Sequence, residues 1–181
     1  NTTASNNTAI GRAALVTNTT GSDNTAVGRA SMFLSTTGTN NTASGSYSLF
    51  TNTTGSYNTG SGDSSLTSNT TGGYNTAFGA SAILLNTTGI NNTASGYQAL
   101  RSNTTASNNT AIGYQASYTN ATGTPNTAVG YQALYANVAS NNDAFGYQTL
   151  DSNTTGSGNA SFGTQALQAN TTGASSTAMG Y

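Results

Sequence analysis

The sequence of 181 residues contains no cysteine and no histidine, and its charged residues are three arginines and four aspartates. Without cysteine no disulfide can hold the fold, and the usual thiolate and imidazole ligands of a metal site are also missing. A Ser–His–Asp triad cannot be built. A pair of catalytic carboxylates would need two of the four scattered aspartates. We therefore expect no catalytic residue, no metal site and no cofactor, and predict that the protein is not an enzyme.

The scarcity of positive charge limits the partners that the chain can have. Its cations are Arg12, Arg29 and Arg101, and its formal net charge is −1. Nucleic-acid binding needs clustered cations that neutralise phosphates, so we expect no nucleic-acid partner. No segment approaches the roughly 18 continuous apolar residues of a membrane helix, so we expect no membrane insertion. Calcium loops of the repeat type need a recurrent aspartate, which this chain lacks.

What the sequence has instead is a repeat, N-T-A-x-G-Y-Q-A-L-x-x-N-T-T-G-x-x, of seventeen residues. We number its positions 1 to 17 from the first Asn. That Asn falls at Asn7, Asn24, Asn41, Asn58, Asn75, Asn92, Asn109 and Asn126, and then, after one shortened copy, at Asn142 and Asn159, while Ser176 replaces it in the last copy. The chain opens at position 12 and closes at position 6. We expect residues 1–181 to form a single repeat array that is a fragment of a longer repetitive fibre.

The period predicts a stack of short coils. A unit of seventeen residues is too short for the helix pairs of solenoids, which need roughly 33 or more. Two extended segments per unit fit better, N-T-A-x-G and A-L-x-x-N-T-T, with glycines at positions 5 and 15 as corners with positive φ. Each residue would then lie about 4.8 Å from its counterpart in the next copy. We predict an all-β fold, a parallel β-solenoid or β-roll of about ten 17-residue coils.

Stacking also explains the lack of charge. Two unit charges about 4.8 Å apart repel by about 0.9 kcal/mol even in bulk water, and a charge at a fixed position would recur in every coil. Asparagine avoids this problem because its amide both donates and accepts, so that it can pair with its own copies. Threonine can act similarly through its hydroxyl. We therefore interpret the Asn at positions 1 and 12 and the Thr columns as self-pairing ladders.

The interior should be thin and apolar. Position 9 is the best interior candidate and position 4 the next. The predicted core residues at position 9 are Leu15, Leu49, Leu66, Leu100, Leu134, Leu150 and Leu167. A core this small would leave a single chain marginally stable. Burying position 4 or the position 6 tyrosines against other copies would help, which predicts a homo-oligomer, with a trimer as the natural form for a fibre.

The stretch NTAVGYQALYANVASNNDAFGYQTLDSNTTG, residues 126–156, resembles the repeats of bacteriophage tail fibres and the head repeats of trimeric autotransporter adhesins. The resemblance covers essentially the whole chain. It implies a parallel β-roll in a homotrimeric fibre, placed outside the cell, on the cell surface or on a virion. The period of seventeen is longer than the adhesin coil, so the resemblance leaves handedness and trimer packing open. It carries no catalytic residue onto this chain.

These observations favour a structural fibre segment, a rigid shaft or head that supports attachment. One alternative is a glycan-decorated extracellular filament, because Asn-x-Ser/Thr sequons are abundant. The predicted glycan acceptors are the position 12 residues Asn18, Asn52, Asn69, Asn86, Asn103, Asn120, Asn153 and Asn170. Another alternative is an ice- or carbohydrate-binding solenoid, from the Thr columns and the Tyr–Gln pairs such as Tyr97–Gln98. A cell-surface glycan is the corresponding partner.

Overall fold

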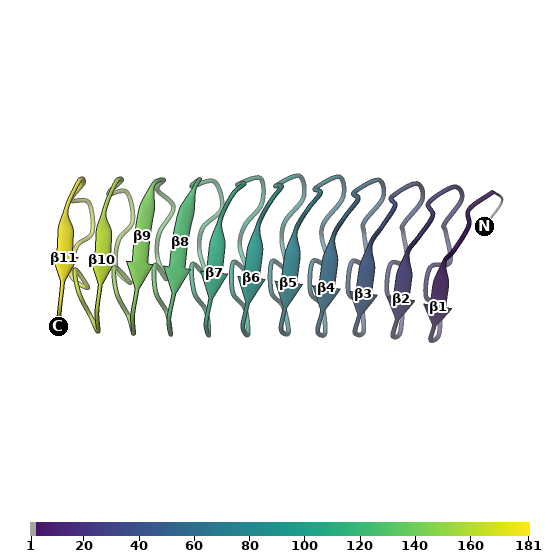
Figure 1. Cartoon of the computed structure of the whole chain (residues 1–181), viewed down its shortest axis with the longest axis horizontal. Coiled ribbons are helices and arrows are strands. Elements are labelled where there is room, and N and C mark those ends of the chain that lie inside the picture. Colours follow the sequence, from purple (N-terminus) through teal and green to yellow (C-terminus); the bar gives the residue numbers. More distant parts are fainter. Residues whose placement is uncertain (1–2) are drawn as a thin grey trace.

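The protein is a stack of about ten coils, each carrying one short β-strand on the same side (Figure 1). The computed structural model describes residues 3–181. The strands are β1 (Thr8–Ile10), β2 (Thr25–Val27), β3 (Thr42–Ser44), β4 (Thr59–Ser61), β5 (Thr76–Phe78), β6 (Thr93–Ser95), β7 (Thr110–Ile112), β8 (Asn126–Val129), β9 (Asn142–Phe145), β10 (Ala160–Phe162) and β11 (Thr177–Met179). They form one parallel sheet of eleven strands in chain order. The predicted all-β parallel solenoid is confirmed, and the described residues contain no helix.

Every strand pairs with its neighbour through the same repeat positions. Thr76 lies opposite Thr93, and the next pair is Ala77 opposite Ala94. The shortened copy keeps this pairing, because Asn126 still lies opposite Asn142 although they are sixteen residues apart. The missing residue is therefore absorbed in the turns, and the sheet continues through the irregular coil.

The second extended segment that we predicted, A-L-x-x-N-T-T, is not a strand. Positions 7 and 9 have positive φ, as in Gln98 (56°) and Leu100 (50°), with Ala99 between them. This turn still binds both neighbouring coils, because Gln98 N donates to Ala80 O at 3.0 Å and Leu100 N to Ala116 O at 3.0 Å. A left-handed conformation costs a non-glycine residue about 1–2 kcal/mol, so the two intercoil bonds and the burial of leucine must offset that cost.

The two glycine positions serve different purposes. Position 5 has positive φ, as in Gly113 (133°), and a Cβ there would lie 2.3 Å from the carbonyl oxygen of Gly130. Position 15 does not have positive φ, so our expectation of a second left-handed corner was wrong. Gly72 is instead needed for space, since an added Cβ would lie 2.4 Å from Oδ1 of Asn69 and 2.5 Å from Gly89 O.

One half of the coil interior is apolar. The position 9 side chains fill it, together with the position 3 and position 8 alanines. Leu49, Leu66, Leu100, Leu134 and Leu150 are fully buried, Leu15 is 8% exposed, and Leu167 packs against this core from the last full coil. Two smaller residues, Ser117 at position 9 and Ser35 at position 12, also lie buried in the stack.

Position 4 faces outward, in contrast to our prediction of a second interior column. Phe78 is 49% exposed and Ile112 is 43% exposed. The reason is the alternation of a strand, in which successive side chains point to opposite faces. Because the position 3 alanines point inward and are buried, positions 2 and 4 must point outward.

Candidate functional surfaces

The other half of the interior is built from two asparagine ladders. At position 1, Asn75 donates from its backbone N (3.0 Å) and from Nδ2 (3.2 Å) to Oδ1 of Asn58 in the preceding coil. At position 12, Asn86 Nδ2 donates to Asn69 Oδ1 at 2.7 Å. The self-pairing that we predicted for asparagine is confirmed at both positions.

In most coils the two ladders meet on one backbone atom. Gly72 O accepts a hydrogen bond from Asn58 Nδ2 at 2.8 Å and another from Asn69 Nδ2 at 2.9 Å. The position 15 carbonyl therefore joins position 1 to position 12 across the coil. These contacts satisfy polar groups that are shielded from water, which buried amides and carbonyls require.

The ladder encloses the predicted glycan acceptors. Asn52, Asn69, Asn86, Asn103, Asn120 and Asn153 are fully buried, Asn18 is 2% exposed, and Asn170 in the last coil is half-buried. A glycan would attach to Nδ2, the atom that donates to the position 15 carbonyl. The sequons with exposed side chains are at position 17 instead, at Asn6, Asn40, Asn91 and Asn108. Our sequence-based prediction placed the acceptors at position 12, although the ladder role of that position already pointed to the interior.

The threonines at positions 13 and 14 have different environments. At position 13 the hydroxyl donates to the carbonyl oxygen of the same position in the next coil, as from Thr53 to Thr70 O at 3.1 Å. The threonine ladder is thus a bond from hydroxyl to backbone and not from hydroxyl to hydroxyl. The position 14 side chains, such as Thr54, are exposed. Among the described strands, the outward face pairs a threonine column at position 2 with the mixed column at position 4, so two Thr columns do not share it.

The Tyr–Gln pairs form two adjoining columns. The rings of Tyr97, Tyr114, Tyr131 and Tyr147 stack with centroid distances of 5.5, 5.1 and 5.2 Å. The glutamines beside them form a side-chain ladder, with Gln115 Nε2 donating to Gln98 Oε1 at 2.9 Å. Because each ring covers the face of the next, the column presents ring edges and hydroxyls to solvent. A sugar would find an open aromatic face only at the ends of the column.

The position 4 column is the main apolar feature of the surface. It is interrupted by serines in the first half of the chain, at Ser44, Ser61 and Ser95. In the second half it runs without interruption through Ile112, Val129, Phe145, Phe162 and Met179. The rings of Phe145 and Phe162 stack at 5.0 Å. The sheet therefore carries an apolar stripe along its C-terminal half.

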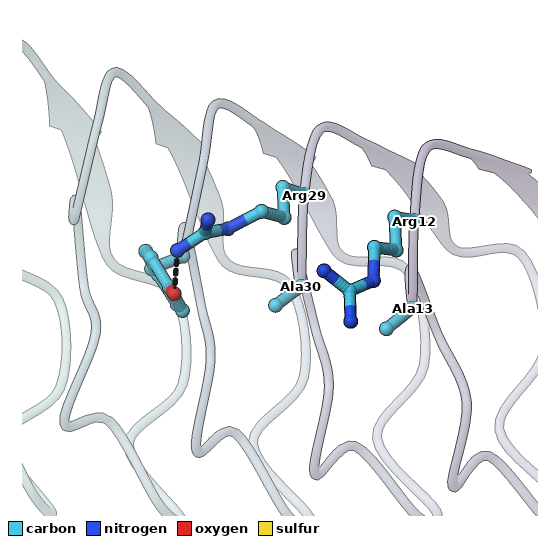
Figure 2. A pocket seen from close by; sticks show the side chains of 5 residues that line it. Arg12, Ala13, Arg29 and Ala30 are labelled. Carbon is cyan, nitrogen blue, oxygen red and sulfur yellow. Dashed lines mark hydrogen bonds between the residues drawn. The ribbon is translucent and has the colours of Figure 1, made fainter.

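The few charged and titratable side chains do not gather into a reaction centre. In the part of the chain that the structure describes, no three Asp residues approach closely enough to hold a metal ion. No helix of residues 3–181 is long and apolar enough to cross a bilayer. Arg101 lies over the ring of Tyr118, with its Cζ 5.6 Å from the ring centroid. Arg12 and Arg29 line the cavity drawn in Figure 2.

Comparison of the chain with protein-family models, with curated proteins and with solved structures found no match.

Proposed function

We propose that this chain is a rigid, nearly uncharged spacer, the shaft or head segment of a fibre that lies outside the cell or on a virion and supports attachment. The observation that carries the proposal is the single in-register sheet that runs through all eleven strands. Neighbouring coils are bonded through their strands and turns, and most of them also through the asparagine ladders. A stack of this kind resists bending and lengthens in proportion to the number of its repeats.

The partner that we propose is a second and a third copy of the same chain. The apolar stripe at position 4 supports self-association, since Phe145 and Phe162 are 37% and 41% exposed and face outward from the sheet. A stripe of this kind on a nearly uncharged surface is a site of association. In a trimer, the three stripes would face one another around the fibre axis and bury the apolar side chains that the thin coil cannot enclose.

Two measurements test this function. Electron microscopy of the purified chain should show straight rods of uniform width, and variants with two or four repeats deleted should be shorter in proportion. Sedimentation equilibrium should give the mass of three chains, and replacing Phe145 and Phe162 by serine should shift the mass toward that of one chain. Flexible particles, or a purified wild-type chain that sediments as a monomer at all concentrations, would argue against the proposal.

A glycan-decorated filament is the second candidate, and the exposed position 17 sequons favour it. Asn40, Asn91 and Asn108 lie on the outside of the coil, where attached sugars would not disturb the ladders. Mass spectrometry of peptides from the natural filament tests this candidate. Hexose-containing adducts on position 17 peptides would support it, whereas unmodified peptides throughout would exclude it.

A further inference from the structure

The first two described coils carry an uncompensated pair of like charges. Arg12 and Arg29 both occupy position 6, in adjacent coils, and no other pair of neighbouring coils repeats a charge at one position. Equivalent side chains in such a stack are about 4.8 Å apart at the backbone. Two cations at that distance repel by about 0.9 kcal/mol in water, so this pair is unfavourable unless something neutralises it.

A cavity of about 280 Å³ lies beside these arginines, lined by Arg12, Ala13, Arg29, Ala30 and Tyr47 (Figure 2). Its origin is the small residue at position 7. From the sixth coil to the tenth that position holds the glutamine ladder, whereas Ala13 and Ala30 leave the space open. Tyr47, which is the position 7 residue of the third coil, closes one end.

The two guanidinium groups differ in how they are held. Arg29 donates a hydrogen bond to the hydroxyl of Tyr47 and lies over its ring, with Cζ 4.7 Å from the centroid. Figure 2 shows the Arg29 side chain extended to this hydroxyl, while the guanidinium of Arg12 lies near Ala30. Among residues 3–181, the guanidinium of Arg12 has no hydrogen-bond partner, whereas its backbone carbonyl oxygen accepts from Ala30 N at 2.9 Å. The cavity lining as described holds no carboxylate, and Asp23 is bound elsewhere, accepting from Asn6 Nδ2 at 2.9 Å.

We propose that this cavity is a binding site for a dianionic phosphate group, either inorganic phosphate or a phosphate monoester. Arg12 would supply free guanidinium donors, and Arg29, held in place by Tyr47, would supply the second positive charge. Guanidinium groups bind phosphate oxygens through paired N–H donors, and such charge-assisted bonds are stronger than neutral ones. A bound dianion would convert the repulsion between the two arginines into a shared attraction. The site is independent of the proposed fibre role.

Isothermal titration of the full chain with inorganic phosphate at low ionic strength and pH 7.5 tests this site. We expect saturable binding at one site per chain. Arg12→Ala and Arg29→Ala should each weaken binding at least about tenfold, because each removes one of two charge-assisted contacts. Arg101→Ala is the matched control, since it removes a cation outside the cavity, and its affinity should equal that of the wild type.

Three further binding measurements identify the ligand. Tyr47→Phe should weaken binding less than Arg29→Ala, because the ring remains while the hydroxyl is lost. Affinity for a phosphate monoester should fall as the pH drops below about 6, where the group loses its second charge, whereas affinity for inorganic sulfate should not change. Tighter binding of a hexose monophosphate than of inorganic phosphate would identify the ester as the ligand, and equal binding would identify the free ion. Absence of saturable binding, or equal binding by Arg12→Ala and the wild type, would overturn the proposal.

Discussion

The side-chain amide of Asn69 donates one hydrogen bond to Oδ1 of Asn52, 2.7 Å away, and a second to the carbonyl oxygen of Gly72, 2.9 Å away. A single buried amide therefore ties its coil to the preceding one and closes its own turn. Only a side chain with both a donor and an acceptor can repeat this arrangement in every coil. This relationship explains why half of a thin interior is polar and why carboxylates are excluded from it.

The asparagine ladder predicts that replacing one of its residues by aspartate, which has the same shape but carries a charge, lowers the stability of the fold strongly. Asn86 donates to Asn69 Oδ1 (2.7 Å) and to Gly89 O (3.0 Å), and accepts from Asn103 (2.8 Å). Asn86→Asp removes both donors and places a carboxylate in the interior. We expect a loss of about 3 kcal/mol or more in the free energy of unfolding at pH 7, measured by chemical denaturation.

The pH dependence of that variant follows from its burial. Burial raises the pKa of the new carboxyl group above its unfolded value. The destabilisation is therefore complete above the folded-state pKa and shrinks as the pH falls, because the protonated group can donate again. Asn91→Asp, at the exposed position 17, is the control and should change stability by less than about 0.5 kcal/mol. Equal losses in the two variants would contradict the ladder.

A natural defect in the ladder predicts a stabilising substitution. Ser35 occupies position 12 where most other coils have Asn, and it is buried with no hydrogen-bond partner for its Oγ among the described residues. Ser35→Asn should supply a donor to Gly38 O and an acceptor for Asn52. We expect a gain of about 1 kcal/mol in the free energy of unfolding, measured by denaturation. Ser46→Asn, at position 6 on the outside of the coil, should have no such effect, and a neutral or destabilising Ser35→Asn would count against the ladder.

A second defect lies in the apolar half of the interior. Ser117 is buried at position 9 between Leu100 and Leu134 in the stack, and its Oγ also lacks a partner in the described part of the chain. Ser117→Leu should bury a side chain of the size that the column holds elsewhere and remove the unpaired hydroxyl. We expect an increase of about 2 kcal/mol in the free energy of unfolding. The exposed Thr105→Leu should change it little, and a loss of stability in Ser117→Leu would show that the column has no room there.

The glycines at position 5 allow steric and conformational effects to be separated. A Cβ on Gly113 would lie 2.3 Å from Gly130 O, whereas one on Gly180 would meet nothing within 4 Å, although φ is similar (133° and 123°). Gly113→Ala should therefore lower the thermal midpoint strongly, because the coils must move apart. Gly180→Ala should lower the thermal midpoint only slightly, because its cost is no more than the roughly 1–2 kcal/mol of a left-handed backbone. Similar shifts of the thermal midpoint in both variants would show that close contact between coils does not cause the loss of stability in Gly113→Ala.

The repeat period and its asparagines allowed the stack, the parallel pairing and the ladders to be predicted from sequence. The left-handed backbone at Gln98 and Leu100 could not be predicted, because neither residue favours it locally. This backbone conformation depends on the stack, because the backbone N–H groups of these two residues donate to the coils on either side, which bend in the same way. The outward direction of position 4 was missed for another reason. Its Ile, Val and Phe residues are of the type found in protein cores, but in the strand it is the small Ala at position 3 that points into the interior.

Distances between spin labels test the stacking of coils most directly, and the chain has no native cysteine that would interfere. Cysteines would replace the exposed position 14 threonines in pairs, Thr20 with Thr88, Thr122 or Thr155, which are four, six and eight coils apart. At about 4.8 Å per coil we predict label distances near 19, 29 and 38 Å, rising linearly with narrow distributions. Broad distributions, or distances that do not increase with the number of coils, would contradict the stack.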